Sequence, residues 1–97
     1  METITPAALK ERLASGEKLH IIDVREPEET ALGIIDGAVN IPLMTIPERL
    51  ADVSQEGETI IVCRSGARSG RAIEYLQAQG YTNLKNMSGG MLEWEQL

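Results

Sequence analysis

An apolar segment that runs into the only cysteine of the chain constrains the fold more than any other feature. Thr59–Val62 is a short apolar run, which is typical of a strand buried inside a sheet. Cys63 follows it directly, and the next residues form a polar stretch rich in glycine, serine and arginine that leads into a helical pattern. A strand, a tight turn and a helix in this order predict an α/β fold with Cys63 at the carboxyl end of a strand.

The rest of the chain repeats this alternation of strands and helices. Thr5 and Pro6 have the residue types of a helix N-cap and a first helical position, and that helix is expected to end at Gly16. Such alternation predicts a mainly parallel sheet of four or five strands flanked by helices. The other expected elements are strands at Leu19–Val24, Ala38–Ile41 and Tyr81–Met87 and helices at 26–32, 46–50, Arg68–Gln79 and 91–94.

The size and charge of the chain limit its possible functions. Its 97 residues are expected to form a single domain spanning residues 1–97, near the small end of typical domains. The formal net charge is -6, yet Arg64, Arg68 and Arg71 fall within eight residues that contain no Asp or Glu. Nucleic-acid binding requires a broad basic face, so one basic segment on an acidic chain favours a small anion as the ligand.

The scarcity of cysteine and histidine narrows the chemistry further. One cysteine excludes an internal disulfide, and one cysteine with one histidine, His20, cannot by themselves complete a zinc site. No apolar stretch approaches the ~18 residues that span a bilayer, and the N-terminus lacks the basic-then-apolar pattern of a signal peptide. We therefore expect a cytoplasmic protein that uses no metal and no cofactor and binds no membrane.

The turn after Cys63 has the features of an anion-binding cradle around a nucleophile. Backbone N–H groups in such a turn converge on a negative ligand, and the following helix adds the positive end of its dipole. Both effects lower the pKa of a cysteine below the ~8.5 of a free thiol and favour the thiolate. The alternative is a buried cysteine followed by an ordinary helix N-terminus with solvated arginines. The residues assigned to the cradle are Cys63 as the catalytic nucleophile and Arg64, Ser65, Gly66, Ala67 and Arg68 as anion-binding residues.

Four blocks of sequence resemble those of the rhodaneses, a family of sulfurtransferases. They follow the family's order and span nearly the whole chain, so the chain is similar to a single-domain rhodanese. One departure is the segment 33–38, where the family often carries a histidine and this chain has none. That segment lies outside the cysteine loop and leaves the expected chemistry intact. The four blocks are Asp23–Glu29, Gly37–Leu43, Cys63–Ser69 and the C-terminal signature Gly80–Asn83 with Gly89–Trp94.

The resemblance implies a rhodanese-like fold and a two-step transfer of sulfur through a persulfide on Cys63. The partners that it implies are a small anionic sulfur donor such as thiosulfate and a thiol or protein that accepts the sulfur. Arg68 matches the family's loop-closing arginine, which either binds the donor or braces the loop internally. Asp23 and Arg25 are expected to support the loop from a neighbouring strand end, with Arg25 paired to an acid such as Glu29.

Two other functions stay open at this point. A rhodanese-like chain can act as a protein-to-protein sulfur relay or as a regulatory module with little turnover of free thiosulfate. A cysteine phosphatase also uses an anion loop with a cysteine and an arginine, but the four residues between Cys63 and Arg68 make a shorter loop than phosphatases have. A smaller cradle suits a sulfur atom better than a tetrahedral phosphate.

Overall fold

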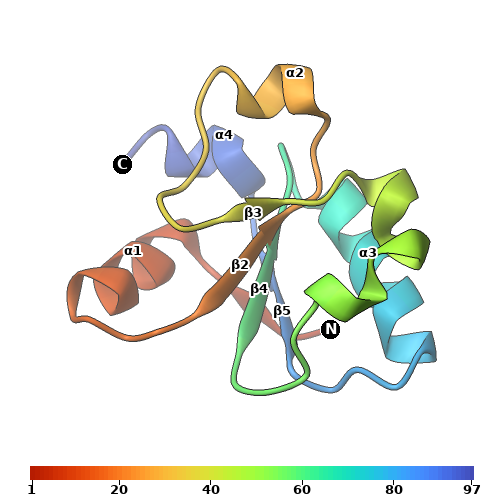
Figure 1. Ribbon diagram of the computed structural model, residues 1–97. Helices are drawn as coiled ribbons and strands as arrows, with labels where there is room; N and C mark the ends of the chain where they lie inside the picture. The colour runs from red at the N-terminus through yellow and green to blue at the C-terminus, as the bar shows by residue number, and fades with distance from the viewer.

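A single parallel sheet runs through the middle of the molecule (Figure 1). The computed structural model describes residues 1–97, and its five strands lie in the order β1-β5-β4-β2-β3 with every neighbouring pair parallel. The predicted parallel α/β sheet is therefore confirmed, with the larger of the two expected strand numbers. The strands are β1 (Thr3–Ile4), β2 (His20–Asp23), β3 (Val39–Asn40), β4 (Thr59–Val62) and β5 (Leu84–Met87).

Two strands differ from the sequence-based expectation by more than one residue at an end, whereas β2 and β3 are each one residue shorter at both ends. β1 was not expected, because two residues are too few to show an alternating pattern. It forms along the edge of β5, which would otherwise expose unpaired backbone groups. β5 begins at Leu84 and not at Tyr81, because the Tyr81 side chain is buried away from the strand and its hydroxyl donates to the Leu50 carbonyl at 3.0 Å.

Four α-helices and two 3-10 helices surround the sheet. α1 (Pro6–Ala14) begins as its residue types predict, with Thr5 Oγ1 accepting a hydrogen bond from the Ala8 N–H at 3.1 Å. The helix expected at 46–50 is replaced by the two 3-10 helices, the first of which contains Pro47, a residue with no N–H to donate. No helix combines the length and the apolarity that a membrane span requires. The remaining helices are α2 (Pro27–Thr30), η1 (Leu43–Glu48), η2 (Leu50–Asp52), α3 (Ala67–Ala78) and α4 (Gly90–Trp94).

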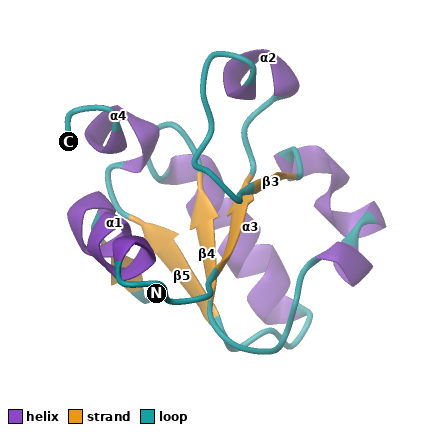
Figure 2. Ribbon diagram, turned by 60° about the vertical axis from the view of Figure 1, so that its left-hand side comes forward, coloured by secondary structure: helices purple, strands orange, loops and turns teal.

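The two faces of the sheet carry separate apolar clusters. Ile60 and Val62 of β4 pack in the cluster that includes residues of α1 and α4. Ile61 and Cys63 alternate with them and pack in the cluster that includes residues of α3 and η1. Figure 1 and Figure 2 show the same layering, with α1 and α4 on one side of the strands and α3 on the other. The Cys63 side chain therefore belongs to the α3 side of the sheet.

The parallel strands end at one edge of the sheet, beneath α2. Figure 2 shows the arrowheads of β4 and β5 pointing to this edge. The segments that follow the strands meet there: the Val24 N–H donates to the Val62 carbonyl at 2.8 Å, and the Met91 N–H donates to the Cys63 carbonyl at 2.9 Å. Ligands of parallel α/β sheets bind outside the carboxyl ends of the strands, so Cys63 lies where such a fold offers a site.

Candidate active site

Cys63 is positioned by the end of β4 and by the turn that opens α3. Gly66 is the N-cap of α3, and its φ of +106° lies in the left-handed region that favours glycine. This conformation turns the backbone toward the sulfur, and the Gly66 N–H donates to Cys63 Sγ at 2.9 Å. The cysteine is only 1% exposed. The turn thus closes over the sulfur with at least one amide aimed at it.

Ser69, in the first turn of α3, supplies a second partner for the sulfur. Its Oγ lies 3.2 Å from Cys63 Sγ, and both side chains are buried. Burial, the strongest single influence, raises the pKa of the thiol, whereas the Ser69 hydroxyl and the backbone N–H groups of Ser69, Gly66 and Ser65 lower it. The hydrogen-bond donors together outweigh burial, so the pKa of Cys63 lies below its ordinary value and the thiolate is favoured.

Asn86, on β5, hydrogen-bonds to both Gly66 and Ser69, two of the residues that donate to the sulfur. Its Nδ2 donates to the Gly66 carbonyl at 3.1 Å, and its Oδ1 lies 2.5 Å from Ser69 Oγ. The site predicted from the sequence lacks this residue. The one signal for it is a polar side chain at an inward position of a strand, because Asn86 shares the face toward α3 with Leu84 of the apolar core.

The two arginines of the loop have different surroundings. Arg68 donates to both carboxylate oxygens of Glu29, in α2, at 2.6 and 2.8 Å. These hydrogen bonds, opposed by partial burial, lower the pKa of Glu29 to about 2. Arg64 is exposed and forms no ion pair. Of the two arginines predicted to bind an anion, Arg64 is therefore free, whereas Arg68 ties the loop to α2.

Asp23 and Arg25 form a buried ion pair at the end of β2. The Arg25 guanidinium donates to Asp23 Oδ2 at 2.8 Å and to the Gly33 carbonyl at 2.7 Å. Arg25 pairs with a nearby acid as expected, but that acid is Asp23 and not Glu29, because Asp23 offers its carboxylate at the same buried strand end and Glu29 is bonded to the loop arginine. Neither side chain of the pair hydrogen-bonds to residues 63–68. The pair is connected to the loop through the pairing of β2 with β4 and through the charge of Arg25, which acts on Glu29, the partner of Arg68.

The start of α4 packs directly against the backbone of the loop. The N–H groups of Met91 and Leu92 donate to the carbonyls of Cys63 and Arg64 at 2.9 and 3.0 Å. Gly90 approaches so closely that a Cβ atom there would lie 2.3 Å from the Arg64 carbonyl oxygen. α4 therefore holds the carbonyl groups of the loop, and only a glycine permits this approach.

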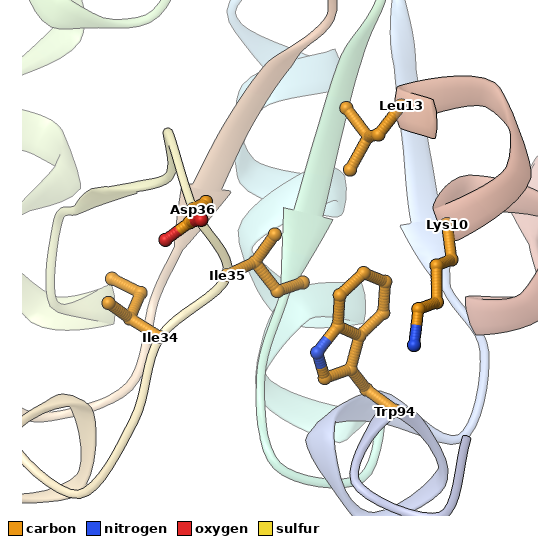
Figure 3. A pocket seen from close by; sticks show the side chains of 6 residues that line it. All are labelled: Lys10, Leu13, Ile34, Ile35, Asp36 and Trp94. Carbon is orange, nitrogen blue, oxygen red and sulfur yellow. The ribbon is translucent and has the colours of Figure 1, made fainter. Parts of the chain in front are cut away.

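The largest hollow of the molecule lies away from Cys63. It has a volume of about 540 Å³ and is lined from α1, α4 and the segment before β3, on the face of the sheet opposite to the Cys63 side chain. Figure 3 shows the Trp94 ring in this hollow between Ile35 and Lys10. A smaller hollow of about 150 Å³ lies beside the cysteine loop and includes Arg64 in its lining. The candidate site is therefore identified by Cys63 and its hydrogen-bond donors, and not by the volume of a hollow.

Comparison with known proteins identifies the family of the chain. The family model of the rhodanese-like domain matches residues 5–97. The putative sulfurtransferase YtwF of Bacillus subtilis is 43% identical over 95 residues, which cover 98% of this chain and 91% of that protein. A sulfurtransferase of Allochromatium vinosum is 40% identical over 91 residues, which cover 94% of this chain and 85% of that protein.

A solved structure shows the same fold. The rhodanese-like domain protein from Staphylococcus aureus matches with a TM-score of 0.91 at 41% sequence identity, covering 97% of this chain and 91% of that chain. The predicted rhodanese-like fold is thereby confirmed, and sulfur transfer is the activity in the names of the relatives from Bacillus and Allochromatium. The sequence blocks, the parallel sheet with its cysteine loop and these matches lead to one conclusion: the chain belongs to the family of rhodanese-like domains.

Proposed function

We propose that this chain is a sulfurtransferase that moves a sulfane sulfur from an anionic donor to a thiophilic acceptor through a persulfide on Cys63. The observation that carries the proposal is the surroundings of Cys63 Sγ, which lies 2.9 Å from the Gly66 N–H and 3.2 Å from the Ser69 hydroxyl oxygen. These groups favour the thiolate, which is the nucleophilic form of cysteine. A general base is then unnecessary for the first step.

In the first step the Cys63 thiolate attacks the outer sulfur of the donor. With thiosulfate, a bond forms between Cys63 Sγ and the outer sulfur, and the bond within thiosulfate breaks. Sulfite leaves with the bonding electron pair, and the outer sulfur stays on the cysteine as a persulfide anion. Arg64 is the loop cation without an ion pair, so it is our candidate for binding the dianion.

In the second step a nucleophile such as a thiolate or cyanide attacks the outer sulfur of the persulfide. The bond to Cys63 Sγ breaks, and the cysteine leaves as a thiolate. The donors that lower the pKa of Cys63 stabilise this leaving group as well, so the same groups assist both steps.

Thiosulfate is the donor that we favour. Support comes from a relative, the thiosulfate sulfurtransferase PspE of Escherichia coli, which is 42% identical over 72 residues. The four-residue spacing between Cys63 and Arg68 favours a sulfur atom over a phosphate, and Arg68 is already bonded to Glu29.

A second candidate is transfer of the persulfide sulfur to a protein acceptor. Leu32 is 90% exposed and lines the small hollow beside the loop together with Arg64. The name of a relative supports this candidate: the putative sulfur carrier protein YrkF of Bacillus subtilis is 37% identical over 91 residues, which cover 94% of this chain and 49% of that protein. This relay differs from the first candidate in its acceptor and uses the same persulfide.

Mass spectrometry of the intact protein tests the proposal. After incubation with thiosulfate, the reduced protein should gain the mass of one sulfur atom, and cyanide should remove it with release of thiocyanate. Cys63→Ser keeps the size of the side chain but offers no thiol, so it should show neither the mass gain nor turnover. A wild-type protein that turns over thiosulfate without ever gaining sulfur, or a Cys63→Ser variant that still gains it, would contradict the persulfide mechanism.

A further inference from the structure

The orientation of the Asn86 side-chain amide follows from its surroundings. The Gly66 carbonyl can only accept a hydrogen bond, so the group of Asn86 that faces it must be the Nδ2 donor, at 3.1 Å. Oδ1 then faces Ser69, and because an amide oxygen can only accept, the Ser69 hydroxyl donates to it across 2.5 Å. All of these groups are buried or partly buried, so water does not compete freely for them.

A serine hydroxyl has one hydrogen, and two acceptors lie within its reach. Asn86 Oδ1 is 2.5 Å from Ser69 Oγ, and Cys63 Sγ is 3.2 Å from it. When Cys63 is a neutral thiol, its S–H donates to Ser69 Oγ and the hydroxyl donates onward to Asn86. When Cys63 is a thiolate, the sulfur can only accept, so the Ser69 hydroxyl can donate to it only by turning its hydrogen away from Asn86.

We propose that Asn86 is a positioning residue that competes with Cys63 for the Ser69 hydroxyl hydrogen. The Ser69 hydroxyl donates to Asn86 Oδ1 while Cys63 is protonated or carries the transferred sulfur. It rotates to donate to Cys63 Sγ when that sulfur is anionic, before attack on the donor and again as the cysteine leaves the persulfide. The hydrogen stays covalently bonded to Ser69 Oγ throughout, so the rotation breaks no covalent bond. The proposal rests on Cys63 being the reactive thiolate of the proposed function.

The two ends of the Asn86 amide are not equally important. The Gly66 carbonyl also accepts from the Gly70 N–H at 3.1 Å, in the first turn of α3. The amide of Gly66 that donates to Cys63 therefore stays held by the helix when Nδ2 is removed. Oδ1, in contrast, is the competitor that draws the Ser69 hydrogen away from the sulfur. Removal of the Asn86 amide should thus make the cysteine more acidic.

The test measures the rate of alkylation by iodoacetamide as a function of pH, which reports the ionisation of Cys63 without any sulfur donor. The midpoint of this curve is the pH at which the alkylation rate reaches half of its maximum. Asn86→Leu should lower this midpoint by about 0.5–1 pH unit, because the Ser69 hydroxyl becomes free to donate to the thiolate. Ser69→Ala should raise the midpoint by about one pH unit, because that donor is lost. In the Ser69→Ala background, Asn86→Leu should cause no further shift.

A matched control comes from the same part of the chain. Asn83 also donates from its amide to backbone carbonyls, those of Ser54 and Gly57, but it contacts no group of the cysteine loop. Asn83→Leu should leave the alkylation midpoint unchanged. All of these variants leave the charged side chains around Cys63 unchanged. On the elements packed around it, these are Asp23 of β2, Glu28 and Glu29 of α2, Glu48 of η1, Arg68, Arg71 and Glu74 of α3, Lys85 of β5 and Glu93 of α4; Arg25, Arg64 and Glu95 lie in the adjoining segments.

An Asn86→Leu midpoint that is unchanged or raised would overturn the proposal, and so would a downward shift of equal size with and without Ser69. If Asn86→Leu does not fold, Asn86→Asp replaces it. Its carboxylate holds the hydroxyl hydrogen more strongly, so the midpoint should rise, and the rise should shrink in the Ser69→Ala background. An equal rise in both backgrounds would overturn the proposal. A persulfide that fails to form while these shifts occur would instead contradict the proposed function alone.

Discussion

The two ends of the sheet use pairs of arginine and carboxylate in different ways. At the amino end, Arg12 of α1 donates to Glu17 and Glu58, and Lys85 of β5 lies 3.1 Å from Glu58. The four side chains are 26–45% exposed. They join α1 to Glu58, which directly precedes β4, and to Lys85 near the start of β5, and the cysteine lies at the other end of β4. Their physical effect is on the stability of the fold.

At the carboxyl end, the pairs lie around Cys63. The Arg25 pair is almost fully buried, with side chains 7% and 1% exposed, and the Arg68 pair joins the loop to α2. Pairing occupies both guanidinium groups and leaves Arg64 as the free cation of the loop. Ion pairs therefore stabilise the fold at the amino end of the sheet, whereas at the carboxyl end they determine which arginine is free to bind an anion. Substitutions at the carboxyl end should change chemistry, and those at the amino end should change stability alone.

The largest effect that separates the two ends is expected from a pair of glycines. Gly90, at the carboxyl end, has a φ of +59°, and a Cβ there would lie 2.3 Å from the Arg64 carbonyl oxygen and 2.6 Å from that of Cys63. Because these are backbone atoms, Gly90→Ala must push α4 away from the loop. We expect a loss of about 2–4 kcal/mol in the free energy of unfolding, measured with urea, and a loss of most persulfide formation.

The control for this substitution lies after α3, near the amino end. Gly80 has a φ of +99°, but no atom lies within 4 Å of its ideal Cβ position. Gly80→Ala therefore carries the backbone strain without the collision, and it should cost roughly 1–2 kcal/mol with no change in the rate of persulfide formation. Equal losses of stability and activity in the two variants would remove the special role assigned to the contact between α4 and the loop.

The elements with a clear periodic signal were predictable from the sequence. β4 is found at Thr59–Val62 as expected, because a strand buried on both faces is a continuous apolar run. α3 begins and ends within one residue of the predicted Arg68–Gln79, because its apolar stripe and the glycine after it are both visible in the sequence. β1 was missed, since its two residues gain their structure only from β5.

The site was predictable only where its residues are neighbours in the chain. Turn chemistry after a buried strand indicates the cysteine loop, because the strand, the glycine and the helix start are contiguous. Asn86 was not identified, since its contacts with Ser69 and Gly66 depend on the pairing of β5 beside β4. Its polar side chain also interrupts the apolar alternation of β5, so the feature that serves the site weakened the prediction of the strand. The partner of Arg68 was likewise beyond local reasoning, because α2 folds over the loop only in three dimensions.

A smaller effect is expected from the free arginine of the loop. Arg64→Ala should raise KM for thiosulfate about five- to thirty-fold and leave kcat nearly unchanged, because a charge contact to a dianion is lost while the surroundings of Cys63 Sγ stay intact. Steady-state kinetics with thiosulfate and cyanide measure this. Arg71, exposed in α3, has the same charge and no ion pair. Arg71→Ala should change KM less than about two-fold. Equal effects of the two substitutions would mean that net charge, and not the position of Arg64, attracts the donor.

The smallest expected effect compares how the ion pairs at the two ends of the sheet make the free energy of unfolding depend on acid pH. The pKa values of Glu29 and Glu58 are each lowered to about 2 from an ordinary 4.5, mainly by hydrogen bonds from Arg68 and Arg12 respectively. A lowered pKa means that each carboxylate stabilises the fold above about pH 4.5 and that this contribution is lost as the pH falls toward 2. Glu29→Gln and Glu58→Gln should each lower the free energy of unfolding at pH 7 by about 0.5–1 kcal/mol, and each should weaken its acid dependence.

Only one of these two variants, Glu29→Gln, should change the ionisation of Cys63. Glu29→Gln removes a negative charge from the partner of Arg68, whose own charge interacts with that of Cys63. The freed guanidinium then stabilises the thiolate more, so the midpoint of iodoacetamide alkylation should fall by a few tenths of a pH unit, roughly the effect of one partly exposed charge. Glu58→Gln should leave that midpoint unchanged, because Glu58 precedes β4 and Cys63 follows it. A shift of the midpoint in Glu58→Gln would show that charge at the amino end also acts on the thiol, and the separation between the two ends of the sheet would fail.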